Sequence, residues 1–173
     1  MIIRYKLFEN KNIDFYDDFF KKEIKDIDYY LNIIDELNIN KYYIKQLFHW
    51  ACMEKLNEFV YKLSQKLDFN DLKGLIRSLI YLDFNYFKKI IIENNLLNYY
   101  LSDKDIVEHI ISKGYVKKIK FLEENGIQLN QKILELSCFH NKLNIFKYLI
   151  SKGLDPNKKT KNNFSYKKLL KRK

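Results

Sequence analysis

The chain has 173 residues, of which 47% are hydrophobic and 16% aromatic, so it can bury a core and is not a disordered polymer. Its formal net charge of +10 would by itself indicate nucleic acid or an acidic membrane surface as a partner. However, residues 158–173 hold eight basic residues and no acidic one, and the rest of the chain has 24 basic against 22 acidic residues. The body is therefore nearly neutral, and only the carboxyl-terminal tail is cationic.

The sequence shows no sign of a membrane segment or of a disulfide framework. No apolar run approaches the ~20 residues that a bilayer-spanning helix needs, and residues 1–6 lack the pattern of a secretory signal. Cys52 and Cys138 fall in matching parts of different repeats, which argues against a disulfide and favours small buried apolar residues. We therefore expect a soluble, intracellular monomer of the cytoplasm, with no cofactor and no membrane partner.

The chain contains an internal repeat. Eight residues recur in the same order 87 positions later: Leu56, Asn57, Phe59, Tyr61, Ser64, Leu67, Asp68 and Asn70 match Leu143, Asn144, Phe146, Tyr148, Ser151, Leu154, Asp155 and Asn157. Weaker copies lie at 84–98 and 116–130, so that the closing asparagines are spaced by 28, 32 and 27 residues. A period of this length leaves room for two short helices and their turns.

In chain order, the predicted repeats are a degenerate copy at 11–40, then 41–70, 71–98, 99–130 and 131–157, with a partial repeat or basic cap at 158–173. Together they would form a single repeat domain over 1–173. Apolar residues three or four positions apart predict a first helix in each full repeat and, after a tight turn, a second helix. The first-helix residues are Ile44, Leu47, Phe48 and Ala51; Leu72, Leu75, Ile76 and Leu79; Ile106, Val107 and Ile110; Ile133, Leu134 and Cys138. The second-helix residues are Leu56, Phe59, Val60 and Leu63; Phe84, Phe87, Ile90 and Ile91; Val116, Ile119 and Leu122; Leu143, Phe146, Leu149 and Ile150.

Glycine and asparagine mark the expected helix ends. Gly126 and Gly153 follow the second helices of the last two repeats, where a left-handed glycine lets the last carbonyl groups accept hydrogen bonds. The closing asparagine of each repeat is expected to cap the next helix. Ser102 with Asp105 predicts a similar helix start.

The last copy carries the most specific pattern. Residues 144–157, Asn-Ile-Phe-Lys-Tyr-Leu-Ile-Ser-Lys-Gly-Leu-Asp-Pro-Asn, resemble the second helix and loop of an ankyrin repeat. The resemblance implies an all-α helix-turn-helix solenoid of ankyrin type, with about four to five repeats and short loops. The repeats are shorter than the family's period of about 33 residues, and the missing residues would come from its projecting loops. The composition and the degenerate repeats are similar to those of ankyrin proteins in large DNA viruses and intracellular organisms. Such an origin would place the protein in a host cell.

No constellation of residues points to catalysis. The motifs of phosphate-binding loops, dinucleotide sites, serine hydrolases and zinc proteases do not occur in the sequence. His49 and Cys52 could share a helix face as metal ligands, but no nearby pair completes a site, so a surface histidine and a core cysteine are favoured. His109 and His140 are expected on the surface or in a turn. The adjacent acidic pairs, expected to be solvated, are Asp17-Asp18 and Glu123-Glu124.

The aromatic residues and the basic tail each leave two alternatives. Exposed tyrosine and tryptophan anchor protein interfaces, whereas buried ones fill a core, and the core is favoured here. The residues concerned are Tyr29, Tyr30, Tyr42, Tyr43, Trp50, Tyr99 and Tyr100. The tail at 158–173 would either bind nucleic acid or serve as a solubilising cap, and the cap is favoured.

These observations favour a non-enzymatic scaffold that binds a protein partner of unknown identity. The resemblance implies that the contact surface is formed by the first helices and loops, and the contact residues stay unknown. The alternative is a nucleic-acid-associated helical protein that works through its basic tail. A third possibility is a structural repeat with no dedicated ligand.

Overall fold

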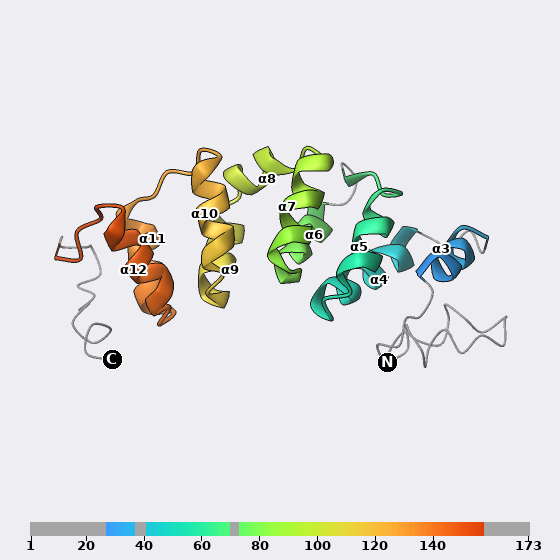
Figure 1. Ribbon diagram of the computed structural model, residues 1–173, viewed down its shortest axis with the longest axis horizontal. Helices are drawn as coiled ribbons and strands as arrows, with labels where there is room; N and C mark the ends of the chain where they lie inside the picture. The colour runs from blue at the N-terminus through green and yellow to red at the C-terminus, as the bar shows by residue number, and fades with distance from the viewer. Residues whose placement is uncertain (1–26, 37–40, 70–72, 158–173) are drawn as a thin grey trace. The chain divides into compact units, whose positions relative to one another are not determined.

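The computed structural model describes residues 27–36, 41–69 and 73–157, and every element in these ranges is a helix (Figure 1). The expected all-α class is thus confirmed for this part of the chain. The elements are α3 (Ile27–Glu36), α4 (Lys41–Met53), α5 (Asn57–Ser64), α6 (Lys73–Ile76), the 3₁₀ helix η2 (Arg77–Tyr81), α7 (Phe84–Glu93), α8 (Leu97–Ser102), α9 (Lys104–Lys113), α10 (Val116–Glu124), α11 (Gln131–Phe139) and α12 (Leu143–Ser151). The ankyrin-type arrangement, the single domain and the repeat boundaries stay predictions.

The chain divides into two compact units, Met1–Ile90 and Ile91–Lys173, called unit 1 and unit 2 below. In unit 1, α4 packs against α5 and against the α6–η2 segment, while α3 packs against α5. The side chain of Asn57, at the start of α5, is paired with Asp83: it accepts from the backbone N–H and donates to the carboxylate, both at 2.9 Å. This pairing fixes the start of α5 against the residue that precedes α7.

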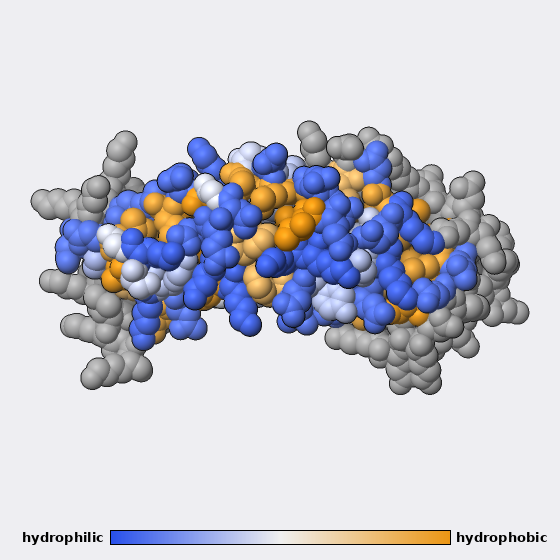
Figure 2. All heavy atoms as spheres, turned by 45° about the horizontal axis from the view of Figure 1, so that its top comes forward, coloured by the Kyte–Doolittle hydropathy of each residue, from blue (hydrophilic) through white to orange (hydrophobic). Residues whose placement is uncertain are grey.

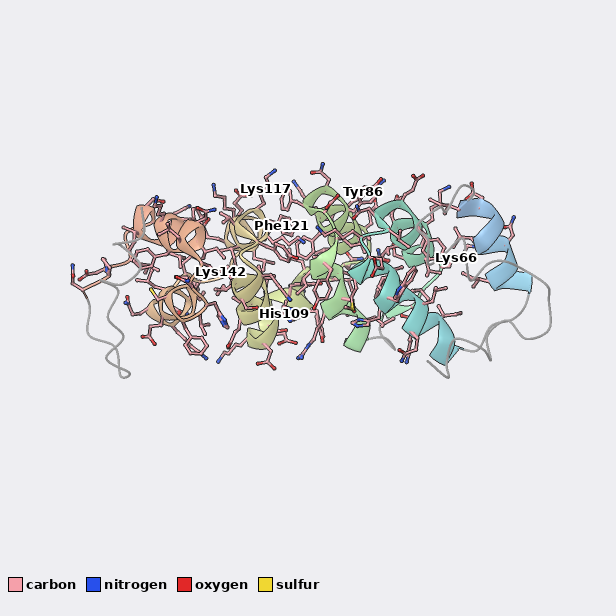
Figure 3. All side chains as sticks on the ribbon, turned by 90° about the horizontal axis from the view of Figure 1, so that it is seen from below. Lys66, Tyr86, His109, Lys117, Phe121 and Lys142 are labelled. Atoms are coloured by element: carbon pink, nitrogen blue, oxygen red, sulfur yellow. The ribbon has the colours of Figure 1, made fainter. Side chains whose placement is uncertain are left out.

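In unit 2, α8 packs against α9, and the four helices α9 to α12 form two pairs in two layers. Within each pair the helices pack against each other, α9 with α10 and α11 with α12. The two pairs lie side by side, so that α9 and α11 form one layer and α10 and α12 form the other. Figure 3 shows the two layers from the side, with Lys117 projecting from the α10 side and His109 from the α9 side. Each short helix therefore gains its stability from neighbours in both directions, as nucleation costs require.

The predicted apolar stripes form the core. Among the stripe residues that the structure describes, most are buried and the others are half-buried. The largest fully buried side chains are Tyr100, Phe48, Phe59, Phe87 and Phe146. On the opposite side of α12, Asn144, Lys147 and Ser151 are exposed, as the helical period requires. The stripes were too narrow, however, because the buried residues also include Ile80, Leu82, Leu96, Ile111, Phe121, Ile145 and the charged Lys118.

Two elements differ from the prediction. In the first helix of the 71–98 repeat, the described part is α6, and from Arg77 the chain continues as the 3₁₀ helix η2 in place of an α-helix. Helix α8 was not expected, because it runs across the predicted repeat boundary between residues 98 and 99. Its residue Asn98 lies inside the helix and so is not a cap for the next one. Leu96 and Tyr100 are buried, and this burial accounts for a helix in place of a loop.

A left-handed residue ends six of the helices in the described part. Gly126 (φ 110°) and Gly153 (φ 89°) confirm the two predicted helix ends. The other left-handed residues are Gly114, Lys55, Asn95 and Asn141. In each case two backbone N–H groups bond back to the last carbonyl groups, as when Gly153 donates to Ile150 and Leu154 donates to Leu149. The same left-handed capping motif therefore ends each of these six helices.

The helix starts were predicted only in part. Asn130 caps α11, because its side-chain oxygen accepts from the Ile133 N–H at 3.1 Å. The predicted start at Ser102 is wrong by one residue: Asp103 is the cap of α9, accepting from the N–H groups of Asp105 and Ile106. Ser102 instead ends α8. Asn40 and Asn70 lie outside the described residues, as does the helix that Asn157 would cap.

In the two most similar copies, the residues that are equivalent in the structure are not the residues that are identical in sequence. The left-handed residues Lys55 and Asn141 are 86 positions apart, and so are Met53 and Phe139, the last residues of α4 and α11. The buried pairs follow the same offset, since residues 59–60 and 63 of α5 correspond to 145–146 and 149 of α12. The identical residues, by contrast, are 87 positions apart. Structural equivalence and sequence identity therefore differ by one residue.

Candidate binding surface

Three large hydrophobic side chains are exposed among the residues that the structure describes: Met53 (53%), Ile92 (51%) and Phe139 (64%). Met53 and Phe139 occupy the same position, the last residue of a first helix just before the left-handed turn. Figure 2 shows hydrophilic residues over much of one face, with hydrophobic residues gathered in separate patches. Because isolated exposed apolar residues are common, a binding role needs further support from their surroundings.

Phe139 has such surroundings. The ring of His140 stands edge-on to it, with centroids 5.0 Å apart. His140 follows α11 as its C-cap, and its backbone N–H donates to the carbonyl of Leu136 at 2.9 Å. Its Nε2 atom lies 3.7 Å from the Glu108 carboxylate on α9, within ion-pair distance if the ring is protonated, but makes no hydrogen bond in the described part. The aromatic pair thus lies at the end of α11 close to α9, and its Phe139 ring is largely exposed to solvent.

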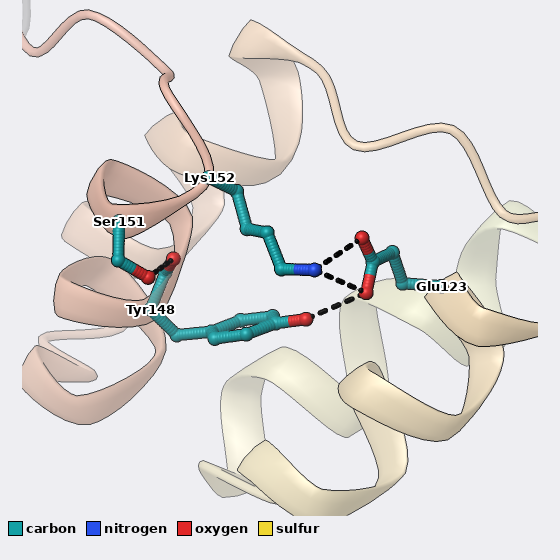
Figure 4. A network of polar contacts seen from close by, with 4 residues as sticks. All are labelled: Glu123, Tyr148, Ser151 and Lys152. Carbon is teal, nitrogen blue, oxygen red and sulfur yellow. Dashed lines mark hydrogen bonds and ion pairs between the residues drawn. The ribbon is translucent and has the colours of Figure 1, made fainter.

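A polar network joins α10 to α12 (Figure 4). Tyr148 donates its hydroxyl hydrogen to Glu123 Oε2 at 2.7 Å, and Lys152 Nζ lies 2.7 and 3.0 Å from the two oxygens of the same carboxylate. The hydrogen bonds from Lys152 and then Tyr148 lower the pKa of Glu123 below its usual value. Ser151 belongs to the same cluster only through its bond to the Tyr148 carbonyl at 2.7 Å.

The two partners of Glu123 shift in the opposite direction. Burial, followed by the hydrogen bond to Glu123, raises the pKa of Tyr148. The hydrogen bond to Glu123 raises the pKa of Lys152. All three groups therefore keep their present protonation states at neutral pH, and the network is a structural clamp. The prediction that Glu123 is simply solvated is wrong, because the side chains of Tyr148 and Lys152 reach it from the next helix pair. Glu124 is exposed, as expected.

His49 and Cys52 have different surroundings. His49 is exposed on α4, and its Nδ1 lies 2.5 Å from the hydroxyl of Ser78 in η2. Cys52 is fully buried, and burial raises the pKa of its thiol strongly. The surface histidine and core cysteine predicted here are confirmed. In the described residues no three His, Cys, Asp or Glu side chains come close enough to hold a metal ion.

The remaining candidates fall into three groups. His140 lies in a turn, as predicted, whereas His109 is half-buried within α9. Tyr100 is in the core, while Trp50 and Tyr99 are half-buried. Placed outside the described residues are Asp17, Asp18, the side chains of Tyr29, Tyr30, Tyr42 and Tyr43, and the basic tail at 158–173.

Sequence reasoning missed Phe139 and the clamp. The position of Phe139 next to Cys138 was available as a signal, since Met53 follows Cys52 in the same way. The clamp had no such signal, because its residues come from different repeats and their contact depends on how the pairs stack.

Comparisons with other proteins do not assign a family or an activity. None of the helices in the described ranges combines the length and the hydrophobicity that crossing a bilayer requires. No family model, curated protein or solved structure matches the chain, so any function has to be argued from its own residues.

Proposed function

We propose that the chain is a non-enzymatic, ankyrin-like helical scaffold that binds a protein partner. The arrangement of short helices in pairs that pack side by side supports the proposal. Such arrays offer an extended surface in place of a catalytic cleft. One further feature is consistent with the proposal: the described residues hold many of their polar groups in caps and clamps, such as the Asn130 cap and the Tyr148–Glu123 hydrogen bond.

The observation that carries the proposal is the exposed ring of Phe139. Large aromatic side chains dominate the energy of protein interfaces when they become buried on binding. Phe139 is 64% exposed, and it stands on a helix end fixed by its capping hydrogen bonds. Little backbone conformational entropy would therefore be lost when a partner covers the ring.

The test is affinity capture with the whole chain immobilised, from a nuclease-treated extract of cells that express it. Phe139→Ser should abolish retention of the specific protein, while Lys132→Ser, an exposed change on the same helix, should leave it unaltered. Far-UV circular dichroism of both variants checks that they are folded. Retention that survives Phe139→Ser but is lost on deletion of residues 158–173, or that is seen only with an extract not treated with nuclease, would instead support the nucleic-acid alternative.

A further inference from the structure

The two layers of unit 2 differ in charge. Helices α10 and α12 with the C-cap Lys152, called here the basic layer, carry five lysines and two glutamates, a net charge of +3. The other layer, α9 and α11, carries three lysines and three acidic residues and is neutral. The lysines of the basic layer are Lys117, Lys118, Lys120, Lys147 and Lys152. This asymmetry arises within the helical body and does not depend on the basic tail.

Three of these lysines are available to a partner. Lys117, Lys120 and Lys147 are exposed, and none forms an ion pair with the residues that the structure describes. Lys120 Nζ lies 5.0 Å from the centre of the Tyr148 ring, which places it at the junction of α10 and α12. Figure 3 shows Lys117 pointing away from the helix pair. The exposed acid of the layer is Glu124, one helical turn from Lys120.

The same layer already binds a carboxylate. Glu123 is held by the ammonium group of Lys152 and the hydroxyl of Tyr148, all within 3.0 Å. Its charge is therefore satisfied by Lys152 and does not neutralise the other lysines. The surface thus combines a built example of carboxylate recognition with three further cations, arranged over two adjacent helices.

We propose that the basic layer binds an acidic polypeptide segment, whose carboxylates pair with Lys117, Lys120 and Lys147. The inference rests on the proposed function in that it names the chemistry of a protein partner, but it uses a different surface from Phe139. Nucleic acid fits less well, because the layer has no arginine for bidentate phosphate contacts. The ring of Tyr148 is also half-buried, with Lys120 and Lys152 over it at 5.0 and 5.5 Å, which leaves less of it for base stacking.

A labelled poly-glutamate peptide, followed by fluorescence anisotropy with the full chain, tests the proposal. The double variant Lys117→Glu with Lys147→Glu should bind the peptide about tenfold more weakly. Each exposed ion pair is of modest strength, but the two substitutions remove or reverse several of them together. The matched control, Lys104→Glu with Lys132→Glu, changes the total charge equally in the neutral layer and should weaken binding by less than about threefold. Glu124→Gln should strengthen binding, and added salt should weaken it.

Two results would overturn the inference. Equal losses in the two double variants would show that only the total charge matters. Tighter binding of single-stranded oligothymidine than of poly-glutamate, dependent on Lys117 and Lys147, would assign the layer to nucleic acid. Phe139→Ser should leave poly-glutamate binding unchanged. The two proposals can therefore fail separately, because peptide binding tests the basic layer and protein capture tests the scaffold.

Discussion

Helices α5 and α12 belong to the two segments that share eight identical residues, yet the identical tyrosines on these helices are used differently. Tyr61 of α5 is turned toward α7, where Tyr86 lies edge-on at 6.3 Å and Lys89 stands over its ring at 3.8 Å. Tyr148 of α12 is turned back toward α10 and donates to Glu123. A shift of one residue on an α-helix is a rotation of about 100°. The difference of one position between sequence register and structural register thus redirects the same side chain to the opposite neighbour.

Equivalent positions in the two copies are therefore better defined by the left-handed turn and by the two adjacent buried residues than by sequence identity. The left-handed residue fixes where the second helix starts, and the two adjacent buried residues fix which side faces the core. Exposed and half-buried residues follow from these constraints. Each prediction below contrasts two positions that the repeat makes comparable.

The largest effect is expected in the buried pair of α12. Phe146 is 1% exposed, so Phe146→Ala should lower the free energy of unfolding by about 3–5 kcal/mol through lost burial and the remaining cavity. Asn144→Ala, on the exposed side of the same helix, should change it by less than about 0.5 kcal/mol. Urea denaturation followed by circular dichroism measures both. Similar values for the two variants would mean that α12 does not face the core as described.

The two cysteines should differ in reactivity although they occupy equivalent positions 86 residues apart. Cys52 is fully buried, and Cys138 is half-buried. Burial raises the pKa of Cys138 to about 11, and that of Cys52 still further. Both thiols should react slowly with an aromatic disulfide reagent at pH 8. Cys138 should react at least about a hundredfold faster, because Cys52 needs local unfolding first. Single Cys→Ser variants assign the two phases, and equal rates would contradict the burial of Cys52.

The redirected tyrosines are compared by removing their hydroxyl groups. Tyr148→Phe loses a hydrogen bond to a carboxylate and should cost about 1 kcal/mol. Tyr61→Phe keeps the ring that contacts Tyr86 and Lys89, and should change stability by less than about 0.5 kcal/mol. Thermal unfolding of both variants provides the measurement. If the two tyrosines were equivalent, as their sequence alignment suggests, the losses would be equal.

The clamp of Glu123 should depend on pH. The pKa of this carboxyl group is lower in the folded chain than in the unfolded one, so its stabilising effect is complete above the ordinary glutamate pKa of ~4.3 and is lost as the pH falls through the folded-state value. The stability difference between the wild type and Glu123→Gln should therefore be constant near neutral pH and shrink below about pH 4. The matched control is Glu124→Gln, which removes an exposed carboxylate outside the clamp. Urea denaturation of the wild type and both variants at several pH values provides the measurement.

Much of the helical fold could be predicted because it depends on local patterns. The apolar stripes located both helices of most repeats, and Gly126, Gly153 and Asn130 marked their ends correctly. Helix α8 and the 3₁₀ segment η2 were missed, since no period of their own distinguishes six or fewer residues from a loop. Lys118 was missed for another reason. It takes the place of the buried Ile145 of the next repeat, and only the packing shows that its stem is buried with Nζ 4.3 Å from the Tyr115 ring centre.

The candidate surface was less predictable than the fold. The exposed ring of Phe139 lies one residue outside the predicted stripe, and the clamp joins residues 25 and 29 positions apart that share no motif. Such contacts depend on which face of one helix pair meets the next. A single-residue change of register is enough to alter that face, as Tyr61 and Tyr148 show.

The smallest effect concerns the turns that set the register. Lys55 and Asn141 are equivalent, and both are left-handed, with φ of 58° and 60°. This conformation costs an ordinary residue about 1–2 kcal/mol, whereas glycine adopts it freely and asparagine tolerates it. Part of the gain from glycine is offset by the greater freedom of the unfolded chain. Lys55→Gly should therefore raise stability by about 0.5–1 kcal/mol, and Asn141→Gly by less. Differential scanning calorimetry of both variants decides the point. A loss of stability in Lys55→Gly would mean that the turn after α4 is not left-handed, and the shared register of the two helix pairs would fall with it.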